Sequence, residues 1–230
     1  WFSWRGVLAV LGLSSVSLGI AYAIWGRGGR FSGQAPDFGA MRLLAAEPVF
    51  WIMMLLFGLA IGSTLGIYTM LPLYLVTERG IDQGWANTLV GLSRISSVGM
   101  ALLSGWVADR FGTRLTIIWV FLFTGFATLL LGIVNSRWVV GFVFLQPMVA
   151  VCFFPAGFAT LSAIGPPSTR NVAVSMTIPP AFLIGAGLFP ALIGFSGDMG
   201  RFSWGIGVAG GLILCGTVAA CFIKLPVEGQ

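Results

Sequence analysis

Long apolar runs, each of about twenty residues, follow one another along this chain and constrain its fold more than any other feature. A helix needs about 20 predominantly apolar residues to cross the hydrocarbon core of a bilayer. The chain has 12 Lys and Arg and 7 Asp and Glu among 230 residues, too few to cover a surface that faces water. We therefore expect an all-α membrane protein, because runs of this length differ from the alternating pattern of a membrane barrel.

Seven segments are long enough to span a membrane, and Arg94 is the only charged residue within them. The predicted spans are residues 7–25, 48–76, 85–108, 115–134, 139–164, 172–195 and 204–223. The connection over residues 26–47 is rich in glycine and is expected to be a linker. Within it, Asp37 is predicted to cap a short surface helix that reaches Glu47.

The basic residues are distributed unevenly between the two sides of the predicted membrane domain. One side carries Arg27, Arg30, Arg42, Arg110, Arg114, Arg170 and Lys224. The other side carries Arg5, Arg79, Arg137 and Arg201. Because cytoplasmic loops carry an excess of Lys and Arg, the first side is predicted to be cytoplasmic. The first residue would then lie outside and the C-terminus inside, in a plasma membrane or a bacterial inner membrane.

The connection over residues 105–114 concentrates charge between two apolar runs. Gly112 is expected to permit a tight turn, and Gly105 to let a neighbouring backbone approach closely. Asp109 at the membrane edge can accept hydrogen bonds from the N-terminus of another helix, where free N–H groups and the dipole favour an anion. The loop is either such a docking contact or simply a positively charged cytoplasmic turn.

Gly105, Asp109, Gly112 and Arg114 resemble the Gly–Asp–Gly–Arg signature of the major facilitator superfamily, which joins the second and third helices of each six-helix half. Thr113 stands where the family usually has a second basic residue. The resemblance implies that residues 1–25 are the last helix of an N-terminal half and residues 26–47 the cytoplasmic linker between halves. Residues 48–225 would form the six-helix C-terminal half, and residues 226–230 a cytoplasmic tail.

A short internal repeat agrees with this arrangement, although chance could also produce it. Phe2-Ser3-Trp4 recurs as Phe202-Ser203-Trp204, each time at the predicted outer start of a span. In a transporter built from two parallel halves, these two spans would hold equivalent places. The rest of the N-terminal half is then a predicted partner that lies outside this sequence. In the family, the loop at Asp109 latches the two halves together and must open during transport.

Arg94 is the strongest candidate for a substrate-binding residue. It precedes Asp109 by 15 positions, about 22 Å along a helix, and so lies within the bilayer. Arginine there costs about 2.5–3.5 kcal/mol on insertion scales, so it requires a role. It could bind an anionic substrate through charge-assisted hydrogen bonds. Alternatively, it could pair with a carboxylate of the N-terminal half or extend to the outer interface.

Three polar residues in other spans are further candidates for substrate binding. Thr64 and Tyr68 lie one turn apart in the first span after the linker, and Gln146 lies in the fourth. The resemblance implies that these two spans line the transport pathway. Pro147 is expected to free a backbone carbonyl near the cavity. For each polar residue, the alternative is a hydrogen bond between helices.

Small residues in the first span after the linker are predicted to pack against another helix. Gly58, Gly62 and Gly66 recur every four residues, the spacing of a close helix–helix contact. The three cysteines, Cys152, Cys215 and Cys221, lie in apolar runs without metal or disulfide spacing. The chain has no histidine and no phosphate-binding glycine loop. We therefore expect no enzymatic activity, cofactor, metal site or nucleic-acid partner.

The expected function is transmembrane transport of a small, preferably organic, anion by alternating access in a secondary transporter, either a symporter or an antiporter. Arg94, Thr64, Tyr68 and Gln146 would bind the substrate within the lipid bilayer. No acidic residue lies within the predicted spans, so a proton-coupling group would belong to the substrate or to the N-terminal half. The alternatives are a passive channel and a seven-helix receptor. A retinal pigment is excluded because the single lysine, Lys224, lies at the end of the last span.

Overall fold

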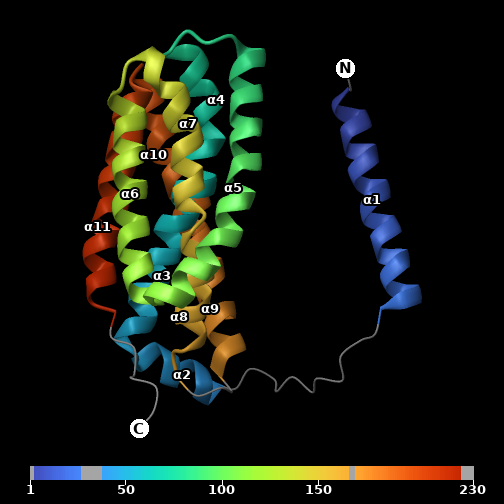
Figure 1. Ribbon diagram of the computed structural model, residues 1–230, viewed down its shortest axis with the longest axis vertical. Helices are drawn as coiled ribbons and strands as arrows, with labels where there is room; N and C mark the ends of the chain where they lie inside the picture. The colour runs from blue at the N-terminus through green and yellow to red at the C-terminus, as the bar shows by residue number, and fades with distance from the viewer. Residues whose placement is uncertain (1–2, 27–37, 166–168, 224–230) are drawn as a thin grey trace. The chain divides into compact units, whose positions relative to one another are not determined.

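The computed structural model describes residues 3–26, 38–165 and 169–223, and these residues are almost entirely helical (Figure 1). Seven helical segments in this part of the chain are long and apolar enough to cross a membrane. They are Trp4–Trp25, Pro48–Thr77, Gln83–Phe111, Thr113–Ile133, Ser136–Ser162, Arg170–Asp198 and Phe202–Cys221. The all-α membrane fold and the number of spans predicted from the sequence are confirmed, with ends that differ by a few residues.

The first span is a compact unit of its own. Ser3 is the N-cap of helix α1 (Trp4–Trp25), and its hydroxyl oxygen accepts a hydrogen bond from the Gly6 N–H at 3.3 Å. Three serine hydroxyls within it donate to carbonyl oxygens one turn earlier, so they are satisfied without a partner helix. These serines are Ser14, Ser15 and Ser17. Hydrogen bonds within the helix are what a helix surrounded by lipid requires, because lipid chains offer no partners.

Helix α2 (Phe38–Ala46) opens the second unit and agrees with the short helix expected at the end of the linker. Its buried apolar side chain is that of Leu44. The Ala45 carbonyl oxygen accepts a hydrogen bond from Trp51 Nε1 at 2.9 Å. The helix packs against α3 and α9. Asp37, the predicted cap, lies outside the described residues.

Three of the six spans in this unit are interrupted, and three are continuous. The continuous helices are α5 (Gln83–Phe111), α6 (Thr113–Ile133) and α11 (Phe202–Cys221). The interrupted spans are α3 (Pro48–Ile61) with η1 (Gly62–Gly66) and α4 (Ile67–Thr77), α7 (Ser136–Ala150) with α8 (Phe153–Ser162), and α9 (Arg170–Phe182) with η3 (Leu183–Leu188) and α10 (Phe189–Asp198). The segments η1 and η3 are π-helical turns, which occur frequently at functional sites.

The two π-helical turns pack against each other through glycines. A Cβ atom added to Gly185 of η3 would lie 2.5 Å from the Gly62 nitrogen and 2.6 Å from the Gly58 carbonyl oxygen. A Cβ atom added to Gly66 would collide with the Gly185 carbonyl oxygen. The packing face predicted for these glycines is therefore confirmed, and it brings the two interrupted spans into backbone contact.

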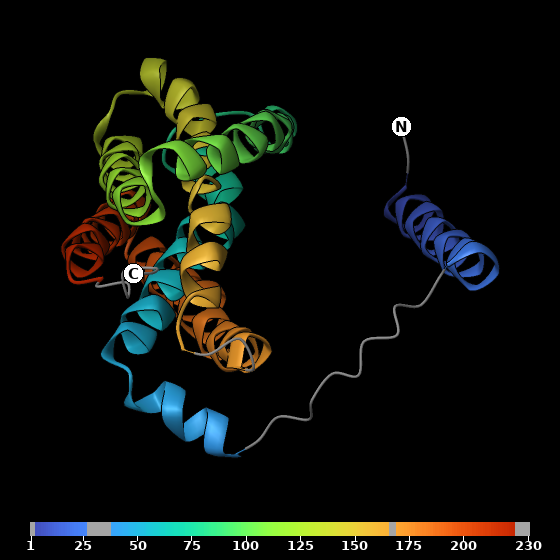
Figure 2. The same cartoon turned by 60° about the horizontal axis from the view of Figure 1, so that its bottom comes forward.

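Helix α11 packs along α6, and other parts of the bundle hold both of its ends (Figures 1 and 2). At its N-terminus, the Glu78 carboxylate accepts hydrogen bonds from the Ser203 N–H, at 2.8 Å, and from the Ser203 hydroxyl. At its C-terminus, Arg114 Nη2 donates to the Cys221 carbonyl oxygen at 2.5 Å. Each side chain carries the charge that complements the helix dipole at that end.

An aromatic core joins the first, third and fourth spans of this unit. The ring centroids of Phe57 and Phe153 lie 4.9 Å apart, and those of Phe121 and Phe153 lie 5.3 Å apart, in edge-to-face arrangements. Phe158 meets Phe57 at 5.0 Å. These rings come from α3, α6 and α8, so their packing holds these three helices together.

Candidate substrate cavity and the loop after α5

Arg94 lies in the membrane-spanning part of α5 and is held by two contacts with the interrupted span α3–η1–α4. Its Nη2 donates to the carbonyl oxygen of Thr64, in η1, at 2.5 Å. Its guanidinium carbon lies 4.2 Å from the centroid of the Tyr68 ring, within cation–π range. No carboxylate among the described residues pairs with it. The charge is therefore balanced here by a backbone dipole and an aromatic face.

Tyr68 is positioned by a proline in another span. Pro147 has no N–H, so the carbonyl oxygen of Val143, four residues earlier, lacks its usual partner in the helix. The Tyr68 hydroxyl donates to that oxygen at 2.6 Å. The carbonyl expected to be freed by this proline is thus present, and it fixes the ring beneath Arg94.

Arg94 lines an open cavity of about 420 Å³ on the bundle. The lining residues are Ile61, Thr64, Leu65, Arg94, Ser97, Pro147, Val151, Phe154, Phe158, Ile178 and Phe182. The Thr64 hydroxyl donates to the Ala60 carbonyl oxygen at 2.9 Å, and the Ser97 hydroxyl to that of Ser93 at 3.1 Å. A guanidinium has five N–H donors, so Arg94 supplies most of the hydrogen-bond donors available in this cavity.

The predicted substrate-binding residues do not all lie at this cavity. Thr64 and Arg94 line it, and the ring of Tyr68 contacts the Arg94 guanidinium. Gln146 is fully buried among helices, where its Nε2 donates to the Ser63 carbonyl oxygen at 3.0 Å and to Thr128 Oγ1 at 3.2 Å. This arrangement favours the alternative considered for Gln146, a hydrogen bond between helices.

Sequence reasoning missed the aromatic wall of the cavity. Phe154 and Phe158 from α8 and Phe182 from α9 all line it. The spacing of four between Phe154 and Phe158 places both on one helix face, but lipid-facing aromatic residues show the same spacing. The sequence therefore contained no signal that separates a cavity wall from a surface in contact with lipid.

The loop after α5 turns as predicted, but its residues differ in their contacts. Gly112 has a φ of +86°, a conformation that favours glycine, and it ends α5 and starts α6. A Cβ atom added to Gly105 would meet no atom of the described residues within 4 Å, so the close approach expected there does not occur within this bundle. Asp109 is exposed and has no hydrogen-bond partner in the described segments. Arg114 binds the end of α11.

The sequence is similar to a known family of membrane transporters. The sequence profile of the Major Facilitator Superfamily matches residues 1–124. A Na(+), Li(+), K(+)/H(+) antiporter from Planococcus maritimus is 32% identical over 140 residues, which are 56% of this chain and 32% of the antiporter. The multidrug resistance protein MdtH from Salmonella paratyphi C is 32% identical over 115 residues, 46% of this chain and 28% of that protein.

A solved structure shows the same fold. The bacterial homologue of the human lysosomal transporter Spinster, in an inward-facing and unoccupied conformation, matches with a TM-score of 0.59 and 15% identity. The match covers 95% of this chain and 57% of the homologue, so the chain spans well under two thirds of the length of these relatives. The profile match extends over more than half of the chain, and the chain is a multi-pass membrane protein that belongs to the Major Facilitator Superfamily.

Proposed function

We propose that this chain is the C-terminal part of a secondary transporter that carries a small organic anion by alternating access. The observation that carries the proposal is Arg94, a guanidinium that faces a cavity within a membrane span and pairs with no carboxylate among the described residues. Arg94 is half-buried within a membrane span, where a cation needs a counter-charge, and a substrate carboxylate can provide it.

Substrate binding would proceed by exchange of partners at the guanidinium. Arg94 Nη2 donates to the Thr64 carbonyl oxygen in the described state. A carboxylate entering the cavity would accept two parallel N–H bonds from the guanidinium and replace that carbonyl as the acceptor. The Tyr68 ring, fixed by its bond to the Val143 carbonyl oxygen, would keep the guanidinium in place during the exchange.

The loop after α5 would control the alternation between two closed states. Asp109 lies in the last turn of α5, where the helix dipole disfavours a carboxylate, and it has no partner in the described bundle. An N-terminal half that presents a helix N-terminus would satisfy it, with Gly105 leaving room for close contact. Arg114 would support this latch from its position on the end of α11.

The segments of the chain would occupy successive parts of a transporter built from two halves. Residues 1–25 would be the last helix of the N-terminal half, 26–47 the linker, 48–225 the C-terminal half and 226–230 the tail. The distribution of Lys and Arg supports an outer first residue and a cytoplasmic C-terminus. The comparisons do not favour the alternatives, a seven-helix receptor or a passive channel.

The antiporter from Planococcus maritimus is named for cations, so cation transport is the competing substrate class. A cation site requires acidic or carbonyl ligands, whereas the lining of the described cavity contains an arginine and no acidic residue. The cavity therefore favours an anion, and coupling to protons would depend on groups on the substrate or in the N-terminal half.

Uptake of a panel of radiolabelled organic anions by the full-length transporter in proteoliposomes tests the proposal. Arg94→Ala should abolish uptake of the transported anion, and Arg94→Lys should retain a small fraction because it keeps the charge but loses the paired donors. Arg137→Ala is the matched control, since Arg137 is exposed in the first turn of α7. Unchanged uptake of every anion by Arg94→Ala would refute the assignment.

A further inference from the structure

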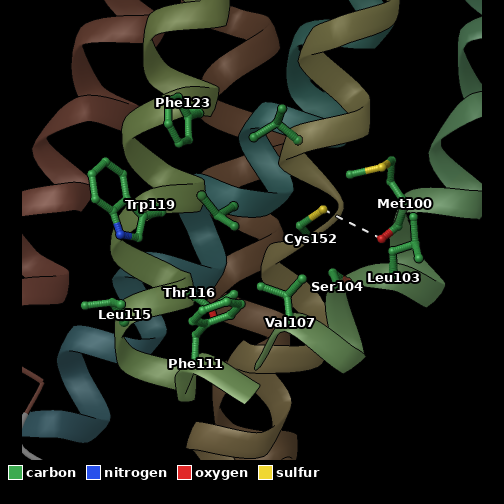
Figure 3. Close-up of a pocket in the computed structure, with 12 residues that line it drawn as sticks. Met100, Leu103, Ser104, Val107, Phe111, Leu115, Thr116, Trp119, Phe123 and Cys152 are labelled. Carbon is green, nitrogen blue, oxygen red and sulfur yellow. Dashed lines mark hydrogen bonds between the residues drawn. The ribbon is translucent and has the colours of Figure 1, made fainter. Parts of the chain in front are cut away.

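A second cavity, of about 450 Å³, lies between α5, α6 and the junction of α7 with α8 (Figure 3), and Arg94 is not among its lining residues. Its walls are side chains at four-residue intervals, namely Leu103, Val107 and Phe111 on α5 and Leu115, Trp119 and Phe123 on α6. Most of these large apolar side chains are about half exposed. The cavity is therefore an open apolar groove on membrane-spanning helices.

The polar groups in this groove are already bonded to backbone carbonyls. The Ser104 hydroxyl donates to the Ala101 oxygen at 2.8 Å, and the Thr116 hydroxyl to the Gly112 oxygen at 2.9 Å. The Cys152 thiol donates to the Met148 oxygen at 3.2 Å, with the Met100 oxygen 3.7 Å away. A polar solute that entered would lose its hydration and find few free partners, since these donors are already used. The groove therefore favours hydrocarbon.

The end of the groove near Phe111 and Leu115 carries a net positive charge. Arg110 and Arg114 are each adjacent in sequence to one of these lining residues, and both are exposed. The Arg110 guanidinium lies over the ring of Trp106, 5.3 Å from its centroid, which leaves its N–H groups available. The Asp109 carboxylate contributes one negative charge at this end. Two guanidiniums and one carboxylate still attract an anionic group at the membrane surface.

We infer that this groove binds one anionic phospholipid, with an acyl chain between α5 and α6 and the phosphate near Arg110. Hydrocarbon in a bilayer is supplied by lipid chains, and the end of α5 at Phe111 and the start of α6 at Thr113 would lie near the headgroups. The acyl chain would fill space against Trp119 and Cys152 that the bundle leaves open. This site is separate from the anion cavity, and it does not depend on what the transporter carries.

Native mass spectrometry of the purified full-length protein tests the inference, with phosphatidylglycerol and phosphatidylcholine of identical chains as probes. One phosphatidylglycerol should be retained several-fold more than phosphatidylcholine. Leu103→Trp, which fills the groove, should remove that lipid, whereas Leu102→Trp should not, because Leu102 is exposed outside the groove. Arg110→Gln should abolish the preference for phosphatidylglycerol, and Arg137→Gln should preserve it.

A second measurement on the wild-type protein does not depend on how the variants fold. Phosphatidylglycerol with a photoreactive group in mid-chain should label peptides that contain Leu103, Trp119 or Cys152, and unlabelled phosphatidylglycerol should compete. Labelling spread evenly over the exposed helices would overturn the inference. Equal lipid retention by Leu103→Trp and Leu102→Trp would also overturn it, as would equal retention of the two lipids by the wild type.

Discussion

At the scale of single residues, the position of Arg94 depends on a chain of backbone contacts rather than on an ion pair. Pro147 frees the Val143 carbonyl oxygen, Tyr68 binds that oxygen, and the Tyr68 ring lies against the guanidinium. The ring and the hydroxyl of Tyr68 therefore have separate roles. The ring contacts the charge, and the hydroxyl fixes the ring.

Substitutions at Tyr68 should separate these two roles. Tyr68→Phe keeps the ring but leaves the buried Val143 oxygen without a donor, so the free energy of unfolding should fall by about 1–3 kcal/mol. Its affinity for the proposed anion should stay within about twofold, because the buried ring remains packed against the guanidinium. Tyr68→Leu also removes the cation–π contact, worth about 0.5–2 kcal/mol, and should lower affinity by about 2- to 30-fold. Thermal unfolding and substrate binding measure the two effects. Equal affinities for the two variants would contradict the role given to the ring.

The sequence predicted some of these residues but not their contacts. Arg94 was identifiable because charge is so costly within a membrane span, and Pro147 because proline removes a helix donor. The partner of Arg94 could not be predicted, since a backbone carbonyl carries no sequence signal. Gln146 was indistinguishable from a substrate ligand for a similar reason. Buried amides serve substrates and neighbouring helices with the same chemistry.

At the scale of elements, the contact between η1 and η3 joins the two spans that each contain a π-helical turn. Gly185 meets the backbone of Gly58 and Gly62 so closely that no side chain fits between them. The glycine spacing predicted a packing face, but the π-helical turns were not predicted, because a change of hydrogen-bond register has no compositional marker. The Thr64 carbonyl that binds Arg94 belongs to one of these turns, so this contact supports the position of Arg94 at its cavity.

A pair of alanine substitutions within η3 should show how much this contact stabilises the bundle. Gly185→Ala places a Cβ atom 2.5 Å from the Gly62 nitrogen and should destabilise the protein by about 1–3 kcal/mol. Gly187→Ala meets no described atom within 4 Å and should be neutral or slightly stabilising, by up to about 1 kcal/mol. Thermal unfolding in detergent compares the two. A similar melting temperature for both variants would show that the contact is not tight.

At the scale of the whole molecule, the chain spans only part of the length of its relatives, and the position of Asp109 is best explained by a further part of the protein. Its carboxylate stands at the unfavourable end of α5 without a partner in the described bundle. Arg114, by contrast, is bound to α11. The sequence motif identified both residues but could not show that one has a partner within this bundle and the other does not.

Asp109→Asn should therefore lower transport without lowering the stability of this bundle. We expect uptake by the full-length protein to fall about 10- to 150-fold, as loss of a charged hydrogen bond of about 1.5–3 kcal/mol would shift the balance between closed states. The melting temperature of the full-length protein should not fall, because the substitution removes a carboxylate from the unfavourable end of the α5 dipole. Asp198→Asn is the matched control, because Asp198 is also exposed at the end of a helix. Wild-type uptake in Asp109→Asn would show that the loop is only a charged turn.

The central claim is that the Arg94 guanidinium recognises a carboxylate in the cavity. Calorimetric titration of the full-length protein with benzoate and with benzamide, its uncharged analogue, tests this most directly. The acid should bind about 10- to 100-fold more tightly than the amide, the factor expected for hydrogen bonds to a charged group, and Arg94→Gln should remove the difference. Equal binding of acid and amide by the wild type, or the same preference in Arg94→Gln, would contradict the account.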